Sequence, residues 1–269
     1  MSDLNFVPPE HLPLGGEAHP GLYGFEDEAG KPMAGGEAIL PILVQRNSSN
    51  YELVGTGFFI TDFGVFVTAK HVLEKDHECG HKFFIWQLIP PDHWDIIPVD
   101  QVNMHQEFDL AVGVVSRSVN KETGEELIHT KLPLSLAKRN KDDLVVTYAY
   151  PNTVIDIENH VFSFKPDFYE GRITECFPSG RDISSLPGPC YQTNMRIHHG
   201  ASGGPVACSE NGKVFAVNTS GLDGVDFHIS YVSQIDPILG LTLMMPGEQG
   251  PEEVTIQELA ELGYVAIDK

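Results

Sequence analysis

The sequence lacks the features that mark membrane-spanning and secreted proteins. It has no run of about 18 consecutive apolar residues, which argues against a membrane-spanning helix. Its start, Met1–Gly21, has no basic segment followed by an apolar one, so we expect no secretory signal peptide. Unless a leader has been removed, we expect a cytoplasmic protein whose thiols stay reduced.

Cysteines and basic residues are also scarce. The four cysteines, Cys79, Cys176, Cys190 and Cys208, include no Cys-x-x-Cys pair, which argues against a zinc knuckle. Lysine and arginine number 17 against 38 aspartates and glutamates, so the formal net charge is −21. Such a chain repels nucleic acid and anionic membranes, and we expect neither as a partner. A protein partner is compatible with this charge, although solubility alone is the simpler interpretation.

The remaining pattern is that of a globular β protein. Hydrophobic residues make up 41% of the 269 residues, enough for a substantial core. Short runs rich in Val, Ile and Phe, punctuated by turn residues, occur in two sets. The polar stretch SRSVNKETGEE, residues 116–126, separates the two sets and is interpreted as a linker. The chain therefore contains two β units, each a barrel or a sandwich.

The tail carries one clear helix signal. Thr255-Ile-Gln-Glu258 has the pattern of a capping box, and Val254 and Leu259 are placed as a hydrophobic staple. Gly263 stands at the expected C′ position. We therefore predict a short structural helix that packs on a barrel.

The stretch RIHHGASGGPV, residues 196–206, contains the pattern Gly-x-Ser-x-Gly. This pattern occurs in the strand–turn–helix elbow of α/β-hydrolases, in the serine loop of β-barrel peptidases and in ordinary turns. The Gly-Gly-Pro after Ser202 discourages the helix that an elbow needs. The hydrolase order of serine, acid and histidine also fails, because His228 is the only histidine after Ser202 and its acidic neighbours crowd just before it. The elbow is excluded.

Two upstream residues supply what a catalytic serine needs. His71 ends the β-like run GVFVTAKHV, and Asp109 directly precedes the run beginning LAVGVV. Taken singly, each is more often structural: a core histidine, a turn acid, a serine in a glycine-rich turn. Together they give the order His, Asp, Ser of the chymotrypsin-type triad. His105 is a competing base but lacks the TAKHV context.

Four blocks of the sequence resemble a trypsin-like, chymotrypsin-fold serine peptidase, and their pattern is most similar to the bacterial heat-shock (Deg/HtrA-type) branch. They span residues 55–221 and read GTGFFITDFGVFVTAKHV, FDLAVGVV, LPLSLAKRNKDDLVVTYAYP, and QTNMRIHHGASGGPV followed by NGKVFAVNTSG. The resemblance implies an all-β fold of two six-stranded barrels in a chymotrypsin-like double barrel. We expect an extended arm at 1–36, the first barrel at 37–130, the second at 131–240 and the tail at 241–269.

The resemblance also implies a serine endopeptidase that acts through an acyl-enzyme and needs no cofactor. Ser202 would be the nucleophile, His71 its general base, and Asp109 the group that orients His71. The backbone N–H groups of Gly200 and Ser202 would form the oxyanion hole. Activity should then fall in acid as His71 is protonated, near its reference pKa of about 6.5.

Three departures from the family pattern bear on activation and location. Ala201 stands where digestive members have the aspartate that pairs with a newly cut N-terminus, so that route of activation is not expected. Val72 replaces the cysteine that follows the histidine in secreted vertebrate enzymes. The residues after Gly240 are too few for the PDZ domains that many heat-shock members carry.

By the same resemblance, two segments line the pocket for the substrate residue before the scissile bond. Their residues are Arg196, Ile197, His198, His199, Asn218, Thr219 and Ser220. Arg196 in the pocket would favour an acidic or non-basic residue; pointing outward, it would pair with a surface acid, and both remain open. Adjacent histidines on a strand point to opposite faces, so His198 and His199 predict no metal site. Asn218–Gly221 should pair with the substrate backbone as an added strand.

Two other functions compete with a peptidase. A catalytically silent or latent relative would bind peptides or serve as a scaffold, an idea that the intact His, Asp and Ser set argues against. An esterase could use the same fold and the same residues.

Overall fold

The structure is a computed structural model of the chain. It describes residues 37–47, 50–89, 93–119, 124, 126–151, 154–156, 161–163, 167–223, 228–247 and 250–268. The arm expected at residues 1–36 lies outside these residues. None of the described helices is both long and apolar enough to cross a membrane.

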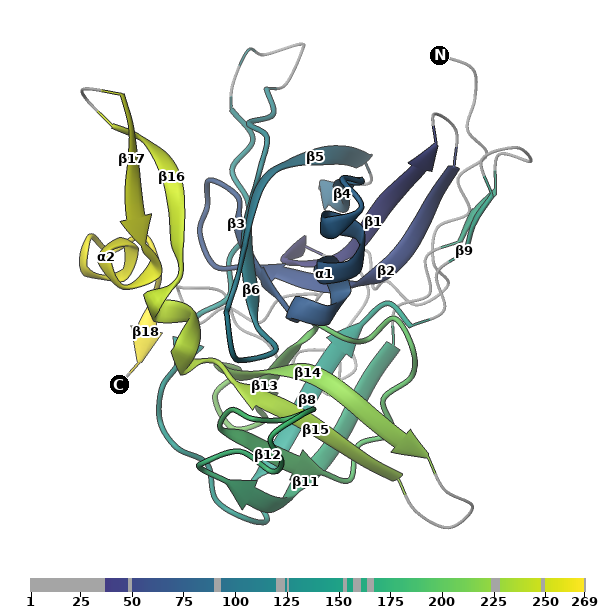
Figure 1. Cartoon of the computed structure of the whole chain (residues 1–269), viewed down its shortest axis with the longest axis vertical. Helices are drawn as coiled ribbons and strands as arrows, with labels where there is room; N and C mark the ends of the chain where they lie inside the picture. The colour runs from purple at the N-terminus through teal and green to yellow at the C-terminus, as the bar shows by residue number, and fades with distance from the viewer. Residues whose placement is uncertain are drawn as a thin grey trace.

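Six antiparallel strands close the first barrel in the order β1-β2-β3-β6-β5-β4 (Figure 1). The strands are β1 (Ile39–Asn47), β2 (Asn50–Phe59), β3 (Val65–Thr68), β4 (Lys82–Ile89), β5 (His93–Met104) and β6 (Ala111–Val115). β-Branched and aromatic residues dominate these runs, as suits strands packed around a core. All four residues of β3 are buried, so the strand that precedes His71 is anchored inside the barrel.

The second barrel also has six strands, in the order β13-β8-β11-β12-β15-β14, and the pairing of β13 with β14 closes it. The strands are β8 (Leu144–Ala149), β11 (Asp167–Phe177), β12 (Cys190–Thr193), β13 (Pro205–Cys208), β14 (Val214–Asp223) and β15 (His228–Gln234). The predicted chymotrypsin-like double barrel is thus confirmed. Strand β13 has only four residues, which give no periodicity of their own, so its place in the barrel depends on its pairing with β8 and β14.

The remaining elements connect or flank the barrels. They are α1 (Lys70–Glu78), β7 (Leu134–Ser135), β9 (Val154–Asp156), β10 (Val161–Ser163), the 3-10 helix η3 (Asp236–Gly240), β16 (Thr242–Gly247), β17 (Gly250–Thr255), α2 (Ile256–Glu261) and β18 (Ile267–Asp268). The expected linker at 116–126 is not featureless, since Val119 and Glu126 form an antiparallel bridge.

The predicted C-terminal helix is confirmed as α2. The Thr255 side chain accepts from the Glu258 N–H at 3.1 Å, and the Glu258 carboxylate accepts from the Thr255 N–H at 2.7 Å, which completes the capping box. Gly263 follows the helix with φ +83°, the left-handed value expected at C′. The β16–β17 hairpin before the helix was not predicted.

The tail returns from the second barrel to the first. The Asn103 amide of β5 donates to the Thr242 carbonyl at 2.9 Å, and the Met244 N–H donates to Gln101 at 3.0 Å. The last strand, β18, then pairs in parallel with β7, which itself pairs with β14. The tail therefore contacts the first barrel and the connection between the barrels.

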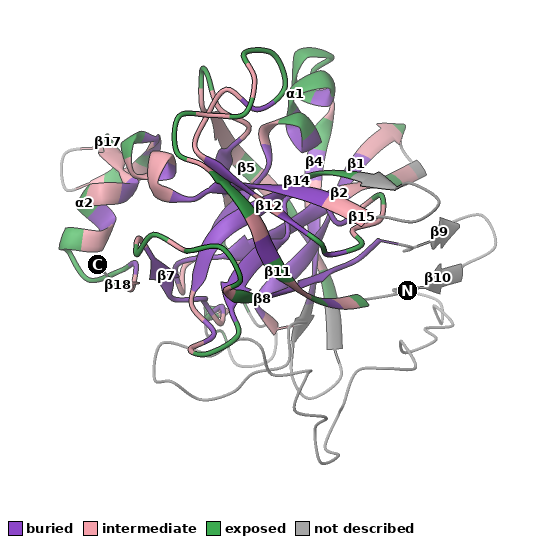
Figure 2. Cartoon of the chain, turned by 90° about the horizontal axis from the view of Figure 1, so that it is seen from below, coloured by how far each residue is buried: buried purple, intermediate pink, exposed green. Residues whose placement is uncertain are grey.

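One buried hydrophobic cluster extends through both barrels. It contains Phe58 and Phe66 of the first barrel together with Tyr148 and Val217 of the second. Figure 2 shows the buried strands at the middle of the molecule, whereas α1 and α2 carry many exposed residues. The barrels thus share a packed interface, and the candidate site lies along it.

Candidate active site between the barrels

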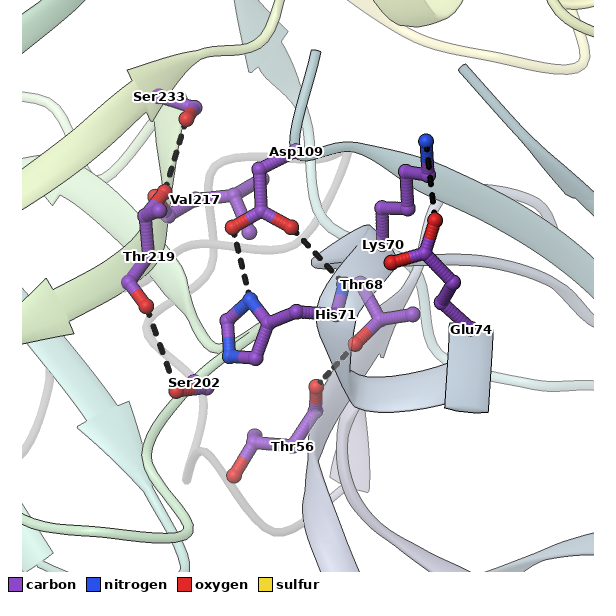
Figure 3. A network of polar contacts seen from close by, with 10 residues as sticks. All are labelled: Thr56, Thr68, Lys70, His71, Glu74, Asp109, Ser202, Val217, Thr219 and Ser233. Atoms are coloured by element: carbon purple, nitrogen blue, oxygen red, sulfur yellow. Dashed lines mark hydrogen bonds and ion pairs between the residues drawn. The ribbon is translucent and has the colours of Figure 1, made fainter. Parts of the chain in front are cut away.

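The structure brings His71, Asp109 and Ser202 together from both barrels. The ring of His71 lies between the other two side chains, with one nitrogen toward Asp109 and the other toward Ser202 (Figure 3). His71 does not end a strand, as the sequence pattern indicated: β3 ends at Thr68, and His71 is the second residue of α1. The first turn of a helix thus presents the imidazole to the other barrel.

Asp109 holds both the ring and the helix that carries it. One carboxylate oxygen lies 2.8 Å from His71 Nδ1, and the other accepts the His71 backbone N–H at 2.9 Å. The N-cap residue Ala69 has no side-chain acceptor for the free N–H groups at the helix start. The Asp109 carboxylate takes that role from a distant loop, where a negative charge also suits the helix dipole.

The environment of His71 favours the protonated ring. Burial lowers the pKa of His71, but the hydrogen bond and charge of Asp109 and the charge of Glu74 outweigh this effect, so the pKa lies above its usual value. The His71 side chain is 46% exposed and that of Asp109 only 15%. The pair is therefore sheltered on its carboxylate side and open on its imidazole side.

His105, the competing base, shapes the loop that leads to Asp109. Its Nδ1 accepts the backbone N–H groups of Glu107 and Phe108 at 3.2 and 3.0 Å, and its ring stacks on Phe108. Burial lowers the pKa of His105, which keeps this nitrogen available as an acceptor. His105 is thus engaged in a turn beside the site.

The backbone of the Ser202 loop is fixed from both barrels. Thr56 of β2 donates its N–H to the Ser202 carbonyl at 2.8 Å, and Gly203 donates to the Asn218 carbonyl at 2.8 Å. Gly203 has φ +86°, and a Cβ there would lie 2.1 Å from the Thr56 carbonyl and from Thr68 Oγ1. Only glycine fits this position, because the loop lies directly against the first barrel.

The hydroxyl of Ser202 donates to the Thr219 carbonyl at 3.5 Å, a long and therefore weak contact. Within the part of the chain that the structure describes, it makes no hydrogen bond to His71. In this arrangement the serine and the imidazole face each other without a bond between them.

The turn before Ser202 determines which backbone N–H groups are available beside the serine. Ala201 donates to the His198 carbonyl at 3.1 Å, and Gly200 at the third position of this turn has φ +88°. This combination is that of a type II turn, which favours glycine there. The N–H groups of Gly200 and Ser202 have no backbone acceptor among the described residues.

The expected pocket residues before the serine differ in their surroundings. Arg196 and His199 are exposed, whereas the Ile197 side chain packs against the core of the second barrel. His198 lies beside Tyr169, with ring centroids 6.1 Å apart. The Ile197 carbonyl approaches β14 closely, since a Cβ on Gly221 would lie 2.9 Å from it. The segment before Ser202 and strand β14 therefore lie close together at Gly221.

Of the expected pocket residues on β14, Asn218 and Thr219 are buried and Ser220 is exposed. Asn218 is fully buried and its amide donates to Thr147 Oγ1 at 2.7 Å, so its side chain faces the barrel. Beyond Asn218, β14 pairs with β15 on one side, and no described strand pairs with its other side. Residues 219–221 therefore offer an unpaired strand edge next to Ser202.

Among the described residues, no three His, Cys, Asp or Glu side chains lie close enough together to hold a metal ion. All four cysteines are free thiols.

Sequence reasoning missed the residues of the first barrel that hold the serine loop. The Thr68 hydroxyl donates to the Thr56 carbonyl at 2.7 Å, and the Thr56 hydroxyl donates to the Gly200 carbonyl at 2.8 Å. The only local signal was the Gly-Thr-Gly of the block GTGFF, in which two glycines leave the threonine close to another backbone.

A family model of the trypsin-like peptidase domain matches residues 55–217, more than half of the chain. The chain belongs to the trypsin-like peptidase domain family. The resemblance noted in the sequence is thereby confirmed. No curated protein matches the chain in a sequence search.

Three solved structures are similar in fold to this chain. Deg5 is similar with a TM-score of 0.55 and 18% identity, over 76% of this chain and 86% of that chain. The active form of the Rv3671c protease from M. tuberculosis gives 0.55 and 19%, over 87% and 84%. The MamO protease domain from Magnetospirillum magneticum gives 0.54 and 12%, over 76% and 94%. At these identities the likeness shows the fold alone.

Proposed function

We propose that this trypsin-like peptidase domain is a serine endopeptidase. The observation that carries the proposal is the position of the His71 ring. One of its nitrogens is hydrogen-bonded to the Asp109 carboxylate at 2.8 Å, and the opposite edge of the ring faces Ser202 of the second barrel. A carboxylate, an imidazole and a hydroxyl in this sequence are the parts that acyl transfer needs.

In the proposed mechanism, Ser202 attacks the scissile carbonyl while the neutral His71 takes the hydroxyl proton. Asp109 fixes the Nδ1–H tautomer and stabilises the imidazolium that forms. The imidazolium then gives its proton to the leaving amine, which departs and leaves the acyl-enzyme. A water molecule attacks the acyl-enzyme carbonyl while His71 takes its proton, and the return of that proton to Ser202 releases the acid product. The developing oxyanion is bound by the N–H groups of Gly200 and Ser202, each worth about 3–4 kcal/mol of transition-state stabilisation.

The proposed substrate is an extended segment of a protein. Its backbone would add to the free edge of β14 at residues 219–221, where main-chain hydrogen bonds supply affinity. Arg196 with His198 and His199 supports a preference for an acidic or non-basic residue before the scissile bond. Pairing of the exposed Arg196 with an acidic side chain of this chain is the alternative role.

A fluorophosphonate probe tests the mechanism, because it phosphonylates only an activated serine, with loss of fluoride. We expect labelling of the native chain, loss of labelling in Ser202→Ala, and strong reduction in His71→Ala. Absence of labelling at any pH from 6 to 9 in the folded protein would instead support a silent peptide-binding relative.

A peptide-library digest tests the substrate class. Cleavage of amide bonds, rather than of ester substrates only, separates a peptidase from an esterase. Enrichment of Asp or Glu before the cut, lost in Arg196→Ala, supports the basic pocket. Equal cleavage after Lys and Glu removes it.

A further inference from the structure

The hydroxyl of Thr56 joins three segments at the seam between the barrels. Thr56 lies on β2 of the first barrel and is fully buried. Its Oγ1 donates to the Gly200 carbonyl at 2.8 Å and accepts the Tyr150 N–H at 3.2 Å. Its backbone N–H donates to the Ser202 carbonyl at 2.8 Å. One residue of the first barrel thus contacts the second barrel at three points around the serine loop.

The chemistry of these partners fixes the direction of each bond. A hydroxyl has one hydrogen and two lone pairs, a backbone N–H can only donate, and a carbonyl can only accept. The Tyr150 N–H therefore occupies a lone pair of Thr56, which leaves the hydroxyl hydrogen for Gly200. The Thr68 hydroxyl donates to the Thr56 carbonyl at 2.7 Å and so fixes the backbone of the same residue within the first barrel.

The Gly200 carbonyl is a sensitive point of the serine loop. It belongs to the peptide that lies between the two N–H groups proposed as the oxyanion hole, those of Gly200 and Ser202. Glycine at φ +88° has a low barrier to other backbone conformations, so the turn needs an external restraint to keep one orientation. The loop after β8 packs on the same point, since a Cβ on Gly200 would lie 3.0 Å from the Pro151 carbonyl.

We propose that Thr56 is a positioning residue for the oxyanion hole. Its side-chain hydroxyl fixes the orientation of the peptide group that joins Gly200 to Ala201. The proposal rests on the proposed peptidase function and adds a residue of the first barrel to the control of that site. A hydroxyl at this position keeps the two N–H groups aimed at one point. Without it, Gly200 samples orientations in which its N–H turns away, and the rate of the acylation step falls while substrate binding along β14 continues.

The test compares Thr56→Val, which keeps the shape, with Thr56→Ser, which keeps the hydroxyl. Thr61→Val is the matched control: Thr61 is also fully buried in the first barrel, and its hydroxyl accepts one backbone N–H, that of Val65, at 2.9 Å. Each purified variant is assayed for kcat and KM on a cleaved peptide, for the rate of fluorophosphonate labelling and for its melting temperature.

We expect Thr56→Val to lower kcat and the labelling rate by about 10- to 100-fold, less than the loss of a whole oxyanion donor, with KM within about threefold. Thr56→Ser should stay within about threefold of the native rate. Thr61→Val should lose thermal stability but keep its kcat. The acid limb of the pH–rate profile should not move in Thr56→Val, because the bonds between Asp109 and His71 are untouched.

Two results would overturn the proposal. One is a folded Thr56→Val protein whose kcat matches that of Thr61→Val, and the other is a Thr56→Ser protein as slow as Thr56→Val. If Thr56→Val does not fold, Thr56→Cys, a weaker donor of similar size, is held to the same criteria. Failure of the native chain to react with the probe refutes the peptidase function itself, whereas native reactivity with an unaffected Thr56→Val refutes only the role of Thr56.

Discussion

Asp109 combines a structural contact with its proposed role in catalysis. Its two oxygens bind the Nδ1 of His71 and the backbone N–H of the same residue. Replacement by asparagine keeps the size of the side chain but removes the charge and favours the wrong tautomer of the ring. We expect Asp109→Asn to lower kcat by about 10⁴-fold.

The same variant should also move the pH–rate profile. Asp109 contributes to the raised pKa of His71, so the native activity should fall with acid already above pH 6.5. In Asp109→Asn the acid limb should lie at lower pH, because the charge that favours the imidazolium is gone. A profile that drops in rate without any shift of this limb would contradict the assigned pairing.

His129 makes the fold sensitive to acid. It is 4% exposed, its Nδ1 lies 2.8 Å from the Gln87 carbonyl oxygen, and burial lowers its pKa to about 4. In the unfolded chain His129 is protonated near pH 6.5. The contribution of its neutral ring to stability is therefore complete above that pH and is lost as the pH falls toward 4. The loss should approach about 3 kcal/mol, at 1.36 kcal/mol per pH unit.

Urea unfolding from pH 7 to pH 4 measures this effect. His129→Gln cannot be protonated, so its free energy of unfolding should fall less steeply with acid than that of the native chain. Parallel curves for the two proteins would show that other groups cause the acid sensitivity.

At the residue scale, the sequence located the three side chains of the proposed triad but not the residues that hold them in place. His71, Asp109 and Ser202 are found from order and flanking blocks, and the structure brings the three together. The bond of Thr56 to Gly200 spans two barrels and has no local pattern. The surroundings of Arg196 could not be predicted either, because the partner of an exposed cation depends on packing rather than on spacing.

Among the elements, α1 and α2 illustrate the difference between distant and local capping. The cap of α2 lies within four residues, Thr255 to Glu258, and was therefore predicted from sequence. The start of α1 is satisfied by Asp109, far away in the chain, and the helix was missed. The strands of both barrels were mostly predicted because their residues alternate or cluster locally, whereas the short β13 depends on pairing with β8 and β14.

The capping box of α2 can be tested without touching the active site. Thr255→Ala removes the acceptor of the Glu258 N–H and should lower the free energy of unfolding by about 1 kcal/mol. Differential scanning calorimetry measures the shift, and kcat should stay at the native value. A variant with unchanged stability would mean that the cap contributes nothing in this tail.

The whole molecule should unfold in one step, because a single buried cluster includes residues from both barrels. Both tryptophans of the sequence, Trp86 and Trp94, lie on strands β4 and β5 of the first barrel, so their fluorescence follows the unfolding of these strands. Far-ultraviolet circular dichroism reports on both barrels. We expect the two thermal transitions to coincide; midpoints that differ by more than a few degrees would show that the barrels unfold independently.

At this scale, family resemblance indicated the double barrel but not how the tail binds it. The connection from η3 through the β16–β17 hairpin to β18 returns to both barrels by contacts such as Asn103 to Thr242. These contacts join residues far apart in the chain. Hydrophobic periodicity describes each segment alone and carries no information on such pairings.

The division of the site between two barrels also has a consequence for the growing chain on the ribosome. Strands of the first barrel end at Val115, so the proposed base and its carboxylate are synthesised before any strand of the second barrel. The nucleophile, the Gly200 turn and the β14 edge come later. A nascent chain therefore cannot cut its neighbours on the same messenger until the second barrel has formed.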